Sequence, residues 1–204
     1  MNARIRNPTL QARLMTADAA AAFIAAGDTV AMSGFTGAGH PKAVPLALAA
    51  RMQQAQARGD AYRVRLLTGA STAPELDGAL ATVDGMELRL PYQSDPTVRE
   101  RINSGQLDYL DIHLGHVGQQ ARGGFFGDID VAVVEIAAVL EDGRLIPSSS
   151  VGNIGKDQHS AVGNGVTKAR QAGTGDGQSR QSAQQSPEAR AVKRGEDERG
   201  AAEC

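Results

Sequence analysis

The chain has 204 residues, a formal net charge of −2 and a single cysteine, Cys204. This length suits one domain of ordinary size, or one domain with a tail. The near-neutral charge excludes a general electrostatic attraction for nucleic acid, and a lone cysteine excludes an internal disulfide framework. The composition therefore favours a reducing compartment, and we expect a cytoplasmic protein without nucleic-acid partners.

The first 30 residues contain basic positions followed by an alanine-rich run, a pattern also found in secretory signals. Asp18 interrupts this run, Gly27 and Asp28 follow it, and no A-x-A cleavage site precedes a mature domain. No apolar run approaches the ~20 residues that a membrane-spanning helix needs. We therefore expect neither secretion nor membrane contact, and predict a helix over 17–26 that is capped by Thr16.

Up to about Val151, short apolar runs alternate with helical patterns. This alternation predicts an α/β domain with a mostly parallel sheet and flanking helices on both faces. Glycines just beyond the expected helix ends are typical of left-handed caps. The predicted strands are 29–32, 64–67, 87–90, 107–114 and 131–139, the predicted helices are 17–26, 41–57, 74–82 and 96–103, and the capping glycines are Gly27, Gly59, Gly85 and Gly105.

The composition changes after Asn153: residues 155–204 contain no Leu, Ile, Phe, Tyr or Trp. Such a segment cannot bury enough apolar surface to offset ~1–2 kcal/mol of backbone entropy per residue. We therefore predict a folded domain over 1–153 and a disordered low-complexity tail over 154–204. Its mixture of Arg, Gly, Ala, Gln, Ser and Glu suggests out-of-frame translation of a GC-rich gene, a hypothesis that translating the locus in its other frames tests.

Three glycines, Gly34, Gly37 and Gly39, lie within six residues between the first strand and the long helix. A turn with so few Cβ atoms lets a phosphate or an oxyanion approach backbone amides closely. The G-x-x-x-x-G spacing is that of a phosphate loop, but His40 and Pro41 replace the Lys-Ser/Thr pair, which excludes an ATP-binding loop. A ligand site and a tight connection without a ligand both remain open.

Polar side chains follow the second and third predicted strands. Ser71 and Thr72 come after residues 64–67, and Gln93 comes after residues 87–90. Ligands bind beyond the carboxyl ends of strands in open α/β sheets, so these side chains are candidate contacts for a carboxylate or a carbonyl. The favoured alternative for Ser71 or Thr72 is helix capping, and Asp95 is expected to cap the helix over 96–103.

His113 and His116 lie three residues apart, but no clear third ligand accompanies them, so we expect no metal site. His116 is instead expected to cap or orient the glycine-rich loop that follows. Glu135 lies in an apolar strand, where an acid needs a partner. A structural acid bonded to loop amides is favoured over a catalytic one.

Taken in order, six segments of the chain resemble the N-terminal domain of the acetyl-CoA hydrolase/transferase family, which includes succinyl-CoA:acetate CoA-transferases. The segments cover about the first three-quarters of the chain and are residues 33–45, 67–71, 90–94, 108–113, 127–132 and 146–153. The resemblance implies an acyl-CoA and a carboxylate as small-molecule partners, coenzyme A as a substrate and no metal or redox cofactor. It also implies a homodimer in the full-length family.

In this family a glutamate attacks the acyl-CoA thioester, giving an anhydride and then a glutamyl-CoA thioester, while main-chain amides stabilise the oxyanion. The resemblance makes the glycine turn one wall of the acyl and carboxylate pocket. The expected substrate-binding residues are Gly34, Phe35, Thr36, Gly37, Gly39, Ser71 and Gln93.

The nucleophilic glutamate of the family lies in a second domain, which has no counterpart in this sequence. Glu135 does not match the motif of that nucleophile, so no catalytic residue is assigned, and we expect a truncated form without acyl-transfer activity. The alternatives are a non-catalytic carboxylate- or CoA-binding module and a non-functional fragment that exposes apolar surface. A remoter one is a sugar-phosphate isomerase of related fold, which should show an acid–lysine pair near the site; Lys42 alone supports it thinly.

Overall fold

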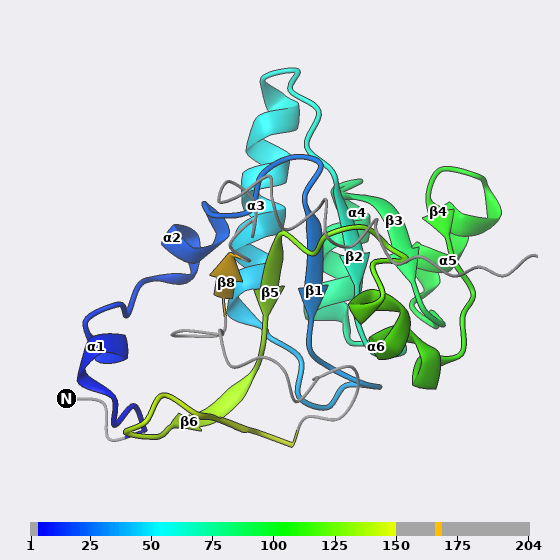
Figure 1. Ribbon diagram of the computed structural model, residues 1–204. Coiled ribbons are helices and arrows are strands. Elements are labelled where there is room, and N and C mark those ends of the chain that lie inside the picture. Colours follow the sequence, from blue (N-terminus) through cyan, green and yellow to red (C-terminus); the bar gives the residue numbers. More distant parts are fainter. Residues whose placement is uncertain (1–3, 150–165, 169–204) are drawn as a thin grey trace, which may run out of the picture. The chain divides into compact units, whose positions relative to one another are not determined.

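A computed structural model describes residues 4–149 and 166–168 of the chain (Figure 1). Its main sheet has the strand order β4-β3-β2-β1-β5-β8, in which the first five strands are parallel and β8 is antiparallel to β5. This arrangement confirms the predicted α/β class with a mostly parallel sheet. The strands are β1 Thr29–Met32, β2 Val64–Leu67, β3 Met86–Leu90, β4 Asp108–Tyr109, β5 Val131–Val133 and β8 Val166–Lys168.

Helices cover both faces of this sheet. Because side chains alternate along a strand, Val30, Val64 and Leu66 point to one face and Leu67 and Leu90 to the other. The first set packs in a large core with α2, α3, η1, α4 and α5, and the second packs with α6. The helices are α1 Pro8–Gln11, α2 Ala17–Ala21, α3 Ala43–Ala57, the π-helix η1 Pro74–Gly78, α4 Ala79–Thr82, α5 Pro96–Asn103 and α6 Leu114–Arg122. None of the helices in the described part of the chain is long and apolar enough to cross a membrane.

The loops that leave the carboxyl ends of β1, β2, β3 and β5 emerge at one edge of the sheet, because these strands are parallel. In Figure 1 the arrowheads of β1 and β5 point in the same direction. This edge carries residues 33–42 after β1, 68–73 after β2 and 91–95 after β3.

The predicted strand over 131–139 is wrong in extent, because the strand is interrupted at Val134 and Glu135. Its first half is β5 in the main sheet, whereas its second half, β6 (Ile136–Val139), pairs with β7 (Leu145–Pro147) in a separate antiparallel sheet. The second sheet packs on Ile5 and Leu10 near the start of the described chain.

The predicted strand over 107–114 is also wrong, because only Asp108–Tyr109 pair in the sheet and Leu114 begins α6. Glycines at positions 115 and 118 hide this helix in the sequence, since glycine disfavours helix interiors. Other boundaries differ by a few residues: α2 ends at Ala21, α3 begins at Ala43 rather than at Pro41, and residues 74–78 form a π-helix turn.

Two of the four predicted capping glycines are confirmed, because Gly59 and Gly105 directly follow the C-caps of α3 and α5 with φ of +85° and +73°. Gly27 also has a positive φ, of +84°, but α2 ends at Ala21, so this glycine lies in a turn and does not cap a helix. At the fourth glycine, Gly85, the left-handed conformation is taken instead by the preceding residue, Asp84, with φ of +50°. A Cβ on Gly85 would lie 2.4 Å from the Sδ atom of Met52, so this glycine leaves room for the side chain of Met52 on α3 and does not cap a helix.

Most of the predicted tail, together with the domain boundary at 153, lies outside the described residues. The exception is β8, whose three residues pair with β5 and so differ from the disorder predicted over 154–204.

Candidate functional site

The glycine turn after β1 is a two-residue hairpin that docks on the neighbouring loop. Phe35 and Ala38 exchange backbone hydrogen bonds of 3.0 and 2.9 Å, and between them Thr36 and Gly37 have φ of +44° and +86°. The amide of Thr36 donates to the carbonyls of Ala70 (3.1 Å) and Ser71 (2.7 Å). Three amides of the turn are therefore already bonded, two of them across the turn itself and that of Thr36 to the loop after β2, against which the turn closes.

Gly34 is required by a close approach within this turn. Its φ is +126°, and a Cβ there would lie 2.6 Å from the Cβ of His40 and 3.1 Å from the Cγ2 of Thr72. His40 is 3% exposed, and its Nε2 lies 3.7 Å from a carboxylate oxygen of Glu75. Neither ring nitrogen has a hydrogen-bond partner among the described residues.

Gln93, after β3, presents a buried amide group in one fixed orientation. Gln93 is only 4% exposed, and its Oε1 accepts hydrogen bonds from the backbone amides of Ser94 (2.8 Å) and Asp95 (2.9 Å). The hydroxyl of Ser71 donates to the same oxygen over 3.1 Å. The Nε2 donors have no partner within the described part of the chain. A buried donor without an acceptor is costly, so this group is a candidate for contact with a ligand.

Ser71 belongs to this cluster rather than to a helix cap. Its φ is +27°, and its Oγ lies 2.6 Å from the Oγ of Ser94. The expectation that Ser71 or Thr72 caps the next helix is wrong, because Ala73 precedes η1 and provides no side-chain bond. The loop after β2 therefore turns Ser71 toward the loop after β3, so the structure brings Ser71 and Gln93 together as the sequence predicts.

A buried ion pair lies beneath these two loops, and sequence analysis missed it. Arg89 and Asp77 are both fully buried, with the Nε of Arg89 3.1 Å from Oδ1 of Asp77. Arg89 also donates to the Thr68 hydroxyl (2.7 Å) and to the carbonyl of Leu90, while Thr72 donates its amide and its hydroxyl to Oδ2 of Asp77, each over 2.6 Å. An arginine within a mostly apolar strand was the available signal, since a buried charge needs a partner.

The ion pair controls the ionisation of Asp77. Burial by itself raises the pKa of this carboxyl group. The charge of Arg89 and the two hydrogen bonds from Thr72 outweigh burial and hold the pKa below its ordinary value. Asp77 is therefore ionised and saturated with donors at neutral pH.

Glu135, between β5 and β6, is a structural acid, but its partners are side chains rather than the expected loop amides. Its Oε2 lies 2.5 Å from the Nζ of Lys42, and its Oε1 accepts from the Ser148 hydroxyl over 2.6 Å. Burial raises the pKa of Glu135, but the bonds from Lys42 and Ser148 and the charges of Lys42 and His40 lower it overall. Lys42 and Glu135 form the acid–lysine pair that the isomerase alternative requires, yet both carboxylate oxygens are already bonded.

Comparison with known proteins decides between the families. Residues 2–161 match the acetyl-CoA hydrolase/transferase N-terminal domain, which is more than three-quarters of the chain. The chain belongs to this family. A propanoyl-CoA:succinate CoA transferase of Escherichia coli K12 is 46% identical over 139 residues, which cover 68% of this chain and 28% of that protein.

Two further relatives cover the same region. A succinyl-CoA:acetate CoA-transferase of Clostridium kluyveri is 41% identical over 150 residues, covering 74% of this chain and 27% of that protein. An acetyl-CoA hydrolase of Schizosaccharomyces pombe is 33% identical over 159 residues, which cover 74% of this chain and 30% of that protein. The chain thus spans less than a third of the length of the relatives it matches.

His113 and His116 of this acetyl-CoA hydrolase/transferase domain lie at the start of α6. His113 caps α6, because its Nδ1 accepts from the amide of Gly115 over 3.1 Å, whereas His116, expected to cap or orient the following glycine-rich loop, lies within α6. The two rings lie 5.3 Å apart between centroids. Within residues 4–149 and 166–168 no group of three or more His, Cys, Asp or Glu side chains is placed to hold a metal ion.

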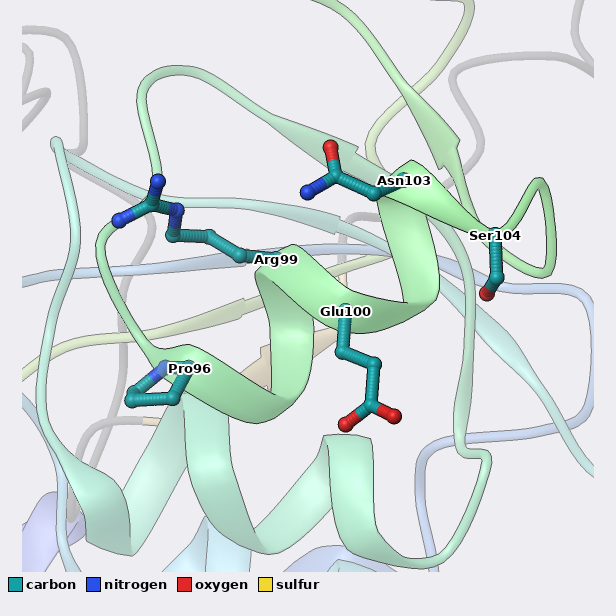
Figure 2. Close-up of a pocket in the computed structure, with 5 residues that line it drawn as sticks. All are labelled: Pro96, Arg99, Glu100, Asn103 and Ser104. Atoms are coloured by element: carbon teal, nitrogen blue, oxygen red, sulfur yellow. The ribbon is translucent and has the colours of Figure 1, made fainter.

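A concavity of about 610 Å³ lies elsewhere in the domain (Figure 2). It is lined by Pro96, Arg99, Glu100, Asn103 and Ser104, all from α5 and its C-terminal cap. None of the predicted site residues lines it, and it carries charges of both signs. We therefore place the candidate site at the loops around Gln93 and not in this concavity.

Proposed function

We propose that this domain forms the acyl- and carboxylate-binding wall of an enzyme that uses CoA thioesters. The reaction is CoA transfer between an acyl-CoA, such as succinyl-CoA or acetyl-CoA, and a carboxylate such as acetate, or the hydrolysis of acetyl-CoA. Membership of the family supports the reaction class, and the names of the relatives support these substrates. The observation that carries the proposal is the buried Nε2 group of Gln93.

The chemistry of Gln93 suits an oxygen ligand. Its Oε1 is occupied by three donors, so the amide presents only N–H groups, and these pair with a carboxylate or a thioester carbonyl. A ligand oxygen would satisfy a donor whose burial otherwise costs ~1–3 kcal/mol. The docked glycine turn, with Gly34, Phe35, Thr36, Gly37 and Gly39, and the adjacent Ser71 form the proposed wall around it.

Coenzyme A is a substrate in this proposal, and the reacting carboxylate comes from outside the described residues. We do not assign that role to Glu135 or Asp77, because hydrogen bonds hold both oxygens of each carboxylate in place. We also infer a cytoplasmic location, which the lone cysteine supports, and a homodimer for the full-length protein, which rests on the family resemblance alone.

Isothermal titration of the 204-residue chain with acetate, succinate and CoA tests the proposal. We expect saturable binding of at least one carboxylate, and its loss in Gln93→Glu, which replaces the donor by an anionic acceptor. Gln53→Glu, at an exposed position of α3, adds the same charge away from the site and should bind as the wild type does. Absence of heat with all three ligands would overturn the proposal.

A further inference from the structure

The buried pair of Arg89 and Asp77 connects the two loops that carry the candidate site. Arg89 contacts Thr68, at the start of the loop after β2, and the carbonyl of Leu90, at the end of β3. Asp77 holds Thr72 through both its amide and its hydroxyl. Thr68 and Thr72 bracket Ser71 in the sequence, and Leu90 lies three residues before Gln93.

We propose that Arg89 and Asp77 are positioning residues that hold Ser71 and Gln93 in the geometry that binds the ligand. The inference rests on the proposed function, because it concerns the same site. Neither residue contacts the ligand in this proposal. The guanidinium group is a planar fork, so its bonds to Thr68, Asp77 and the Leu90 carbonyl fix the two loops relative to one another in distance and in orientation.

Stability alone does not account for a pair of this kind. Well-packed hydrophobic residues of similar volume often replace a buried ion pair without loss of stability. Hydrophobic residues cannot replace the directional hydrogen bonds of the pair, because apolar contacts do not fix the orientation of a loop as a set of hydrogen bonds does. The Ser71 hydroxyl and the Gln93 oxygen are 3.1 Å apart, so a small shift of one loop relative to the other breaks one of the three bonds that orient the Gln93 donors, namely the one that joins the two loops.

The test uses the 204-residue chain with an Asp77→Leu/Arg89→Met double substitution. Two readouts are taken: titration with acetate and succinate, and amide hydrogen exchange over residues 68–72 and 91–95. We expect a folded protein whose affinity falls at least about tenfold, as for loss of roughly one oriented charged hydrogen bond, with faster exchange in both loops. The control is Asp84→Asn/Arg101→Met, which removes the 2.7 Å pair of Arg101 and Asp84, and with it the pair of Asp84 and Arg63, away from these loops, and should leave both readouts unchanged.

A single substitution covers the case in which the double variant does not fold. Thr72→Val removes only the hydroxyl that bonds Asp77 over 2.6 Å, and Thr82→Val, which removes an exposed hydroxyl from α4, is its control. We expect Thr72→Val to weaken binding at least about threefold and to speed exchange over 68–72, while Thr82→Val does neither.

The outcomes separate the two proposals. A folded double variant that binds within about twofold of the wild type and exchanges at its rate overturns the positioning role, and so does a Thr72→Val variant that behaves like Thr82→Val. Failure of the wild type to bind any carboxylate overturns the proposed function instead. In that case the exchange rates still decide whether Arg89 and Asp77 hold the loops.

Discussion

At the scale of single residues, Gly34 and Gly37 share a left-handed backbone but differ in their surroundings. Gly34 has φ of +126° and would place a Cβ 2.6 Å from His40, whereas Gly37 has φ of +86° and would meet nothing within 4 Å. The two positions therefore separate the cost of backbone conformation from the cost of a clash.

We expect Gly37→Ala to lower the free energy of unfolding by about 1–2 kcal/mol, the cost of a left-handed alanine. Gly34→Ala adds a clash with the Cβ and Cα of His40, so we expect a loss of about 3 kcal/mol or more. Urea denaturation of the two variants measures both values. Equal losses would contradict the close approach of His40 to Gly34.

The lowered pKa of the Asp77 carboxyl group makes the stability of the domain depend on pH. Because its pKa is lowered in the folded state, its contribution is fully present above the ordinary carboxyl pKa of about 3.9 and is lost as the pH falls through the lowered value. Asp77→Asn leaves Arg89 buried without its counter-charge, and we expect a loss of about 3–5 kcal/mol at pH 7.

Urea denaturation at pH 7, 5 and 3 checks this prediction, because the difference between wild type and Asp77→Asn should shrink only at the lowest pH. Asp60→Asn, at a side chain that is 64% exposed, is the control and should change stability by less than about 0.5 kcal/mol at each pH. A difference that does not depend on pH would contradict the ionised state of Asp77.

At the scale of elements, α5 shows how one capping residue fixes the end of a loop that carries the site. The Oδ1 of Asp95 accepts from the amides of Thr97 (2.9 Å) and Val98 (3.1 Å), as the sequence predicts. The amide of Asp95 in turn donates to Gln93, so the start of the helix and the orientation of the Gln93 side chain are connected.

Asp95→Ala should therefore cost about 1 kcal/mol of stability, the usual value for loss of an N-cap, and should also weaken carboxylate binding. Glu100→Ala, on the exposed face of the same helix, should change neither quantity by a comparable amount. Thermal unfolding and titration with acetate measure the two effects. A destabilised variant with unchanged affinity would show that the cap supports the helix alone.

The elements predictable from the sequence are those that local signals define. The strands at 29–32 and 64–67 are confirmed because short apolar runs end there in turn residues, and the caps at Thr16 and Asp95 are confirmed because short polar side chains precede each helix. The break at Glu135 was not predictable, since it depends on Lys42 and Ser148, which are distant in the sequence. Likewise α6 begins at a histidine cap, a signal too weak to outweigh its glycines.

At the scale of the whole described domain, the site depends on contacts that cross the sheet edge. Ser71 and Gln93 were predictable as candidates because parallel strands bring their carboxyl ends together. The bonds that orient them were not, because Arg89 and Asp77 come from a strand and a helix whose pairing only the fold reveals. The sequence leaves open whether the glycine turn presents its amides to a ligand or is a tight connection, and three of its amides bind within the chain.

The same arrangement predicts a division between binding and chemistry. Among the carboxylates bonded at this edge, Asp77 and Glu135 have both oxygens engaged in hydrogen bonds, which lowers their nucleophilicity toward a thioester. We therefore expect the 204-residue chain to bind a carboxylate but to form no acetyl-CoA from succinyl-CoA and acetate, and to release no CoA from acetyl-CoA. A thiol assay and chromatographic separation of the CoA thioesters measure both reactions. Turnover that survives Glu135→Gln and Asp77→Asn would place the nucleophile at a residue other than these two, whereas turnover abolished by Glu135→Gln, in a variant that still binds the carboxylate, would overturn the structural role of Glu135.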